Sequence, residues 1–230
     1  LGDVYKRQLW QDIDTSNSEG ATNLVRMLGG FTNTMTPDHE EPVIKVAFRD
    51  HKTDDGPGEN LIDPEQFFTP KEFQNADHRI CGEFDAYGQF RGTVEIFGKT
   101  FSDHVISWKD GRGLPTRCGP FKIAFAAVSG TSRDTFLSLE DWGDLSAKMN
   151  AYGGLYIYRD GIRILPYGNA DYDWLEIEKN RSKKADYYFF SFRRMFGVVT
   201  ISRAQNGNLQ EKAGREGFRE NEAYRQFRSI

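Results

Sequence analysis

The sequence predicts an α+β fold, with a mostly antiparallel sheet and a few helices. Arg79 to Trp108 alternates apolar and polar residues around two glycine-containing turns, a pattern typical of a β meander. Leu155 to Ile164 alternates in the same way around an Asp-Gly dipeptide, which is a strong hairpin signal. Leu139 to Tyr152 repeats apolar residues at three- and four-residue spacing, which indicates an amphipathic helix.

Composition indicates a soluble, cytoplasmic protein. The chain has 230 residues, of which 38% are apolar and 14% aromatic, enough to bury a core. No segment approaches the roughly 18 consecutive apolar residues that a membrane span requires. Cys81 and Cys118 lie far apart without metal-ligand spacing, so buried free thiols are expected.

Charge is unevenly distributed along the chain. The net charge is -4, but residues 176–230 carry 12 Lys and Arg against 7 Asp and Glu. That stretch therefore has a net charge of about +5, and the rest of the chain about -9. A basic C-terminal quarter suits the phosphates of a nucleotide or of nucleic acid, or simply forms a solvated surface.

The remaining elements follow from local patterns. The expected helices are Glu19 to Phe31 and Glu216 to Phe227, and the expected strands are Val43 to Phe48, Gly119 to Val128, Tyr187 to Phe192 and Phe196 to Ser202. After the second hairpin, Pro166 and Gly168 should stop its return strand. Trp174 and Leu175 should then pack back onto it as apolar anchors.

The residues of the second hairpin are more specific than its pattern. Residues 158–168 read Tyr-Arg-Asp-Gly-x-Arg-x-Leu-Pro-Tyr-Gly, and Asp-Trp-Leu follows at 173–175. This stretch resembles the second domain of bacterial GHKL-type ATPases, the superfamily of gyrase B, MutL and the ninety-kilodalton heat-shock chaperone. The likeness is to large bacterial proteins described only as ATP-binding, and it extends from Gly119 through the segments 196–202 and 209–223.

The resemblance implies a division of the chain. Residues 1–8 resemble translated sequencing-adapter sequence and are set aside as an artefactual tail. Residues 9–48 correspond to the end of an ATPase domain, and 49–118 to an inserted loop and β meander. Residues 119–230 would form a transducer-like domain of the ribosomal-protein βαββ type. The chain is then expected to be a fragment that is inactive alone, with ATP and Mg²⁺ bound mainly by a preceding domain.

The resemblance also implies two site residues, Lys212 and Arg215. In GHKL enzymes a loop of the second domain places a Lys or Arg on the γ-phosphate of ATP, where a fixed cation neutralises charge in phosphoryl transfer. Arg215 before Glu216 resembles the chaperone's Ser-Arg-Glu and is the expected catalytic contact, and both cations would bind the nucleotide. Gly214 and Ala213 stand where the family has Asn and Thr or Ser.

Both cations are expected directly ahead of the helix that starts at Glu216, whose N-terminus would add positive charge at the phosphate. The alternative to a phosphate site is that this Lys and Arg lie on a solvated surface at the start of a helix. If the loop does act on ATP, it would couple hydrolysis to movement of the two domains, and homodimer closure would follow.

Residues 54–58 are a competing motif. Asp-Asp-Gly-Pro-Gly resembles the adenine-binding box of GHKL ATPases, and Glu19 to Asn23 resembles the helix that precedes it. The chain would then be a complete but divergent ATPase. Arg26 stands where an aspartate is expected, and no glycine-rich lid follows. A polar loop with a Pro-Gly turn is therefore the favoured interpretation.

A non-enzymatic binding module is the alternative from another class. Residues 179–193 combine clustered cations with aromatic side chains, as single-stranded nucleic acid sites do, and the meander offers a surface for a protein partner. His39, His51, His78 and His104 lack the spacing of a metal site, and none is expected to hold a metal.

Overall fold

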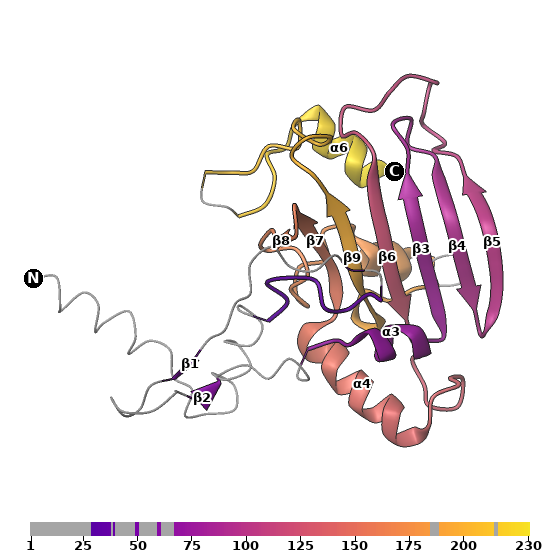
Figure 1. The fold of residues 1–230 in the computed structure, drawn as a ribbon. Helices are drawn as coiled ribbons and strands as arrows, with labels where there is room; N and C mark the ends of the chain where they lie inside the picture. Colours follow the sequence, from indigo (N-terminus) through magenta and orange to yellow (C-terminus); the bar gives the residue numbers. More distant parts are fainter. Residues whose placement is uncertain are drawn as a thin grey trace, which may run out of the picture.

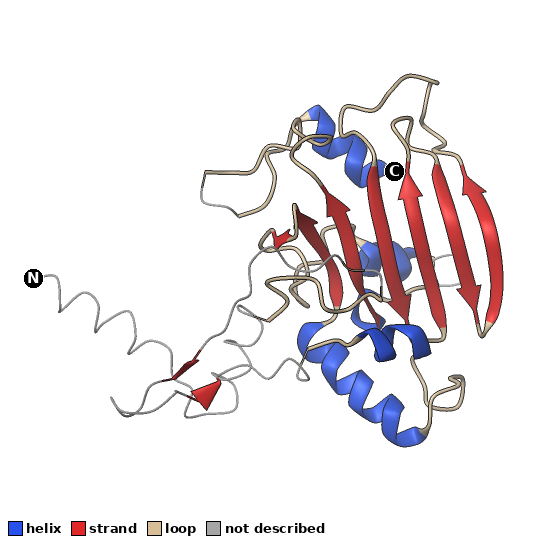
Figure 2. Cartoon of the chain, in the orientation of Figure 1, coloured by secondary structure: helices blue, strands red, loops and turns tan. Residues whose placement is uncertain are grey.

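The computed structural model describes residues 29–37, 39, 49–50, 59–60, 67–184, 189–213 and 216–230. These residues form a seven-stranded sheet, a separate two-stranded pair and four α-helices (Figures 1 and 2). Of the six neighbouring strand pairs in this sheet, five are antiparallel and one is parallel. The predicted α+β class with a mostly antiparallel sheet is confirmed.

The strands are β1 Arg49–Asp50, β2 Glu59–Asn60, β3 His78–Phe84, β4 Phe90–Ile96, β5 Lys99–Ile106, β6 Phe121–Ala127, β7 Gly154–Arg159, β8 Ile162–Arg163 and β9 Met195–Ile201. The helices are α3 Pro70–Asn75, α4 Leu139–Tyr152, α5 Ile177–Lys183, the short 3₁₀ helix η2 Phe192–Arg194, and α6 Glu222–Ser229. The meander, the second hairpin and the helix at 139–152 appear where the sequence predicts them.

The seven strands lie in the order β5-β4-β3-β6-β9-β7-β8. All neighbours are antiparallel except β7 and β9, which run in the same direction. The meander of β3, β4 and β5 is continuous with the strands that follow it, because β3 also pairs with β6. The predicted strands at 119–128 and 196–202 are therefore central strands of the same sheet, β6 and β9.

The side chains of the strands alternate between the two faces of the sheet and contribute to two hydrophobic clusters, one on each face. On β7, Leu155 and Ile157 enter the first cluster, whereas Tyr156 and Tyr158 enter the second. Successive side chains of a strand point to opposite faces, so a strand buried on both faces must be apolar throughout. All four residues are at most 2% exposed.

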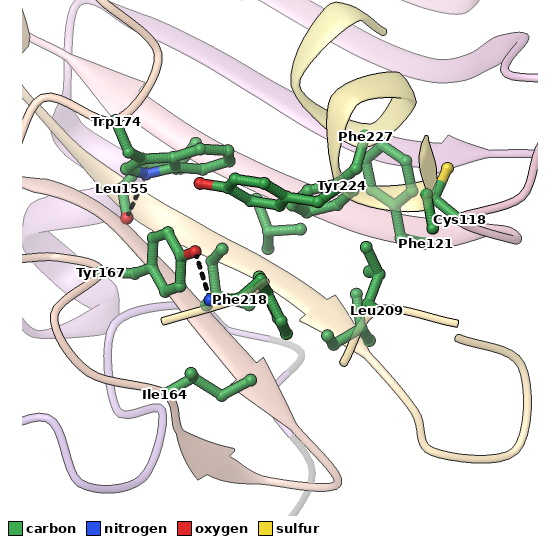
Figure 3. Packing of buried hydrophobic residues seen from close by; sticks show 14 residues of the cluster. Cys118, Phe121, Leu155, Ile164, Tyr167, Trp174, Leu209, Phe218, Tyr224 and Phe227 are labelled. Atoms are coloured by element: carbon green, nitrogen blue, oxygen red, sulfur yellow. Dashed lines mark hydrogen bonds between the residues drawn. The ribbon is translucent and has the colours of Figure 1, made fainter. Parts of the chain in front are cut away.

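The first cluster lies between the sheet and α6 (Figure 3). Trp174, 5% exposed, stacks on Phe227 of α6 with the ring centroids 5.7 Å apart. Its indole N–H donates to the backbone oxygen of Leu155 at 3.2 Å, so the polar atom of a buried ring is satisfied. The predicted anchoring of Trp174 on the hairpin is confirmed, and Leu175 packs partly buried against the same cluster.

The second cluster is closed by α3 and α4, which lie together at one end of the sheet (Figure 2). Thr69 and Glu72 form a capping box at the start of α3, where each side chain accepts a backbone N–H of the other residue. Phe68, next to this cap, stacks on Phe196 of β9 with the rings 4.1 Å apart. The cap thus fixes the chain that delivers an aromatic ring to the core.

One buried carboxylate ties α4's leading loop to the sheet. Asp77, 1% exposed, accepts hydrogen bonds from the N–H of Ser129 at 2.8 Å, the hydroxyl of Thr135 at 2.9 Å and the N–H of Phe136 at 3.0 Å. A buried carboxylate is tolerated where such donors replace water. The loop between β6 and α4 therefore depends on Asp77.

Two predicted elements differ in the structure. The helix predicted from Glu216 begins only at Glu222, because the Asn221 side chain accepts the N–H of Tyr224 at 2.9 Å and caps the helix there. The strand predicted at 187–192 is also wrong for its described part, since Phe189 to Ser191 are irregular and Phe192 opens η2. Residues 187 and 188 lie outside the described residues.

The two cysteines differ in exposure. Cys118 is buried and free as expected, but Cys81 is exposed, because its side chain lies on the sheet face beyond the helices. The expected helix from Glu19 lies outside the described residues except for its last three positions, which form turns and bends. The expected strand at 43–48 and the motif at 54–58 also lie outside them.

We predict that Asp77→Ala lowers the free energy of unfolding by about 3 kcal/mol, because it leaves buried donors without an acceptor. Asp77→Asn retains one acceptor oxygen and should cost less. Denaturant unfolding followed by circular dichroism measures both, with the exposed Asp110→Ala as the control. Equal stability of Asp77→Ala and this control would show that the carboxylate does not hold the loop.

His78 should give stability a pH dependence. The ring is buried against Phe97 and Phe190, and its Nε2 has no hydrogen-bond partner among the described residues. Burial lowers the pKa of His78 below its ordinary value of 6.5, although the Asp77 charge opposes this. The unfolded chain then binds the proton more readily, so the stabilisation is complete above the ordinary pKa and is lost as pH falls below it.

We therefore predict that, between about pH 6.5 and pH 5.5, the parent loses stability more steeply than His78→Leu, by up to about 1.4 kcal/mol per pH unit. Urea unfolding at several pH values measures the two slopes. Parallel slopes would mean that His78 takes up its proton equally well in the folded protein.

Candidate functional site

The candidate site is the segment between β9 and α6, which contains both predicted cations. Figure 1 shows this segment extending beyond the sheet before the chain returns to α6. The predicted site residues are thus carried by a long excursion of the chain. Its value as a site depends on how firmly it is held.

The base of the segment is fixed by Asn206, which is fully buried. Its side-chain oxygen accepts the N–H of Ser202 at 2.9 Å, and its amide donates to the backbone oxygens of Cys118 at 2.7 Å and Pro120 at 2.9 Å. An asparagine can close a turn on its own backbone while it bonds a distant strand. The start of the excursion is thereby attached to the chain entering β6.

Residues 210–219 then form a short hairpin. The N–H of Arg219 donates to the Gln210 oxygen at 2.8 Å, and the N–H of Lys212 donates to the Gly217 oxygen at 2.9 Å. Between these bonds, Glu211 pairs with Phe218 as an antiparallel bridge. Gly217 has φ +87°, a conformation that favours glycine. The described residues of this hairpin are 210–213 and 216–219.

The return strand of the hairpin is bound to the core. Phe218 is 2% exposed, and its N–H donates to the hydroxyl of Tyr167 at 3.1 Å (Figure 3). Burial raises the pKa of Tyr167, so the hydroxyl stays neutral. Tyr167 belongs to the Leu-Pro-Tyr-Gly run of the second hairpin. One role of that run is therefore to hold the hairpin that carries Lys212.

The turn of the second hairpin supports the same segment. Asp160 has φ +51° and Gly161 φ +81°, as the predicted Asp-Gly turn requires. The Asp160 carboxylate accepts the N–H of Arg203 at 3.2 Å, and the Asp160 N–H donates to the Ile201 oxygen at 3.1 Å. This turn is thus attached to the point where the chain leaves β9.

The structure describes one of the two predicted cations, Lys212. Lys212 is exposed, and no ion pair of its side chain is found within the described ranges. Arg215, the expected catalytic contact, lies with Gly214 outside the described residues. The expectation that a helix begins at Glu216 is corrected, since residues 217–219 belong to the return strand of the hairpin and α6 begins at Glu222. A helix N-terminus therefore does not adjoin the cations.

Comparisons with known proteins add no family. A scan of protein-family models found no match to this chain, and searches of curated proteins and of solved structures found none either. The function therefore has to be inferred from the residues and their geometry.

A groove of about 590 Å³ lies elsewhere on the molecule. It lies on the sheet face that carries the second hydrophobic cluster, where α3 and α4 do not cover the strands. Its charged lining includes Glu83, Arg91, Lys122 and Asp160. Side chains of both charges line the groove, and Lys212 is not among them. In the described ranges no group of three or more His, Cys, Asp or Glu side chains could hold a metal ion.

The basic-aromatic stretch at 179–193 is less open than its sequence suggests. Lys179 lies 2.9 Å from Glu176 and Arg181 lies 3.6 Å from Glu178, so both cations have acidic neighbours. Phe192 is 1% exposed and therefore unavailable for base stacking. No helix in the described part of the chain is long and apolar enough to cross a membrane.

Sequence reasoning missed the anchoring residues Tyr167 and Asn206. Tyr167 lies inside the motif at 158–168, but the sequence indicated only a turn position there. The Asn-Gly dipeptide at 206–207 indicates a turn, whereas its bonds to a distant strand leave no local trace.

Proposed function

We propose that this chain contains the transducer-like second domain of a GHKL-type ATPase. In this proposal the hairpin 210–219 brings Lys212 and Arg215 to the γ-phosphate of ATP, which is bound with Mg²⁺ in a separate N-terminal domain. The observation that carries the proposal is that an exposed lysine stands on a projecting hairpin whose base and return strand are attached to the core.

The residues present fit a phosphate contact rather than a complete nucleotide site. Lys212 offers a compact, exposed cation, and a positioned cation stabilises charge on the γ-oxygens during phosphoryl transfer. A set of carboxylates for Mg²⁺ was not found among the described residues, so the metal would be held by the other domain. ATP with Mg²⁺ would supply the phosphoryl group and neutralise its charge.

The anchors explain how such a contact moves a domain. The hairpin is joined to Tyr167 of the second hairpin and, through its base, to the entrance of β6. A force applied at Lys212 would therefore be transmitted through these hydrogen bonds to the sheet. Loss of the phosphate contact after hydrolysis would release the two domains from each other, and a cytoplasmic homodimer would open with them.

A binding module for a protein partner is the second candidate. It is favoured by β5, an edge strand along which every residue is exposed. Phe101, Val105 and Ile106 are each about half exposed on this edge. An open edge with apolar side chains is a template for strand addition by another chain. Nucleic acid binding is the weaker form of this alternative, since it depends on the stretch at 179–193.

We predict that Lys212→Ala and Arg215→Ala each lower the ATPase turnover number by at least about tenfold, with nearly unchanged affinity for ATP, because the lost contact acts in the transition state. The assay is steady-state hydrolysis by the protein in which this chain is joined to its ATPase domain. Nucleotide affinity is measured alongside by calorimetry.

Exposed cations outside the hairpin provide matched controls, Lys109→Ala for the lysine and Arg112→Ala for the arginine. Both should retain the parent turnover. Unchanged turnover in Lys212→Ala and Arg215→Ala would refute the proposed phosphate contact and favour the binding module.

A further inference from the structure

We propose that Arg159 is a positioning residue that fixes the hairpin 210–219, and with it Lys212, to the end of β7. This inference rests on the proposed function for its catalytic consequence, but its structural part stands on contacts alone. Arg159 does not reach the nucleotide in this proposal. It acts through the residues that it binds.

Arg159 binds both strands of the hairpin at once. One guanidinium nitrogen donates to the Glu211 carboxylate at 2.6 Å, and the other donates to the backbone oxygen of Leu209 at 2.5 Å. Its central carbon lies 5.3 Å from the ring centroid of Phe218, on the opposite strand. Glu211 and Phe218 are themselves bridge partners, so one side chain contacts the hairpin at the bridge that joins its two strands.

The contact is partly shielded from water. The side chains of Arg159 and Glu211 are 15% and 30% exposed, in contrast to the ion pair of Arg91 with Asp103, whose side chains are 69% and 78% exposed. Ion pairs at exposed positions contribute little, whereas a shielded guanidinium with several acceptors holds a defined geometry. The Arg159 pair is thus better suited to fixing an orientation than the Arg91 pair.

The position of Lys212 follows from this contact. Lys212 comes directly after Glu211, and successive side chains along a strand point to opposite sides. When Arg159 holds Glu211 inward, the Lys212 side chain is directed outward, in agreement with its exposure. Without the contact, the hairpin would keep Tyr167 and Asn206 as anchors but lose the one nearest to Lys212.

An arginine is required because a single side chain serves two acceptors in different directions. A lysine at this position keeps the charge but lacks the planar fork of the guanidinium. It therefore binds the Glu211 carboxylate and the Leu209 oxygen less well at the same time. Arg159→Lys should therefore give an intermediate effect, and Arg159→Gln a full one. This order separates loss of positioning from simple loss of charge.

The structural part is tested by limited trypsin digestion of the chain itself, followed by mass spectrometry. Cleavage after Lys212 requires local opening of the hairpin, and we expect Arg159→Gln to accelerate it by about tenfold while the unfolding midpoint changes little. Glu211→Gln, which leaves β7 untouched, should accelerate it as well and serves if Arg159→Gln does not fold. Arg91→Gln is the control, because it removes the exposed pair with Asp103. Equal cleavage rates in all variants would overturn the proposal.

The catalytic part is tested in the protein joined to its ATPase domain. Arg159→Gln should lower the turnover number with little change in KM, and adding it to Lys212→Ala should cause no further loss, since both act through one contact. If Arg159→Gln opens the hairpin but turnover falls only in Lys212→Ala, the positioning role is wrong. If the hairpin opens and Lys212→Ala has parent turnover, the proposed function fails while the anchoring by Arg159 stands.

Discussion

The parallel pairing of β7 with β9 is the constraint on which the rest of the structure depends. Each strand contributes apolar side chains to both hydrophobic clusters, so the two layers of the protein are joined through this pair. Close approach is required on the other side of β9 as well. A Cβ at Gly197 would lie 2.4 Å from the backbone oxygen of Ala124 on β6, which explains a glycine in the middle of a buried strand.

This pairing also places the candidate site. Parallel strands end at the same edge of a sheet, and Arg159, the last residue of β7, is opposite Ile201, the last residue of β9. The chain leaving β9 therefore starts beside Arg159 and Asp160 and can be held by both. The position of Lys212 is a consequence of the sheet topology rather than of the hairpin alone.

Local patterns predicted much of the fold but little of the site's support. The meander, the Asp160–Gly161 turn and α4 follow from periodicity and turn chemistry, which act over a few residues. The start of α6 was misjudged because the pattern from Glu216 is helical, whereas the Asn221 cap and the Gly217 conformation decide the boundary. The role of Arg159 was not predictable, since its partner Glu211 is 52 residues away along the chain.

The most direct measurement is photo-crosslinking with an ATP analogue that carries its reactive group on the γ-phosphate, in the protein joined to its ATPase domain. Mass spectrometry then maps the labelled residues. If the hairpin reaches the γ-phosphate, label appears within residues 210–219 and is lost when excess ATP competes. Label found only in the ATPase domain, with none on the hairpin, would contradict the account.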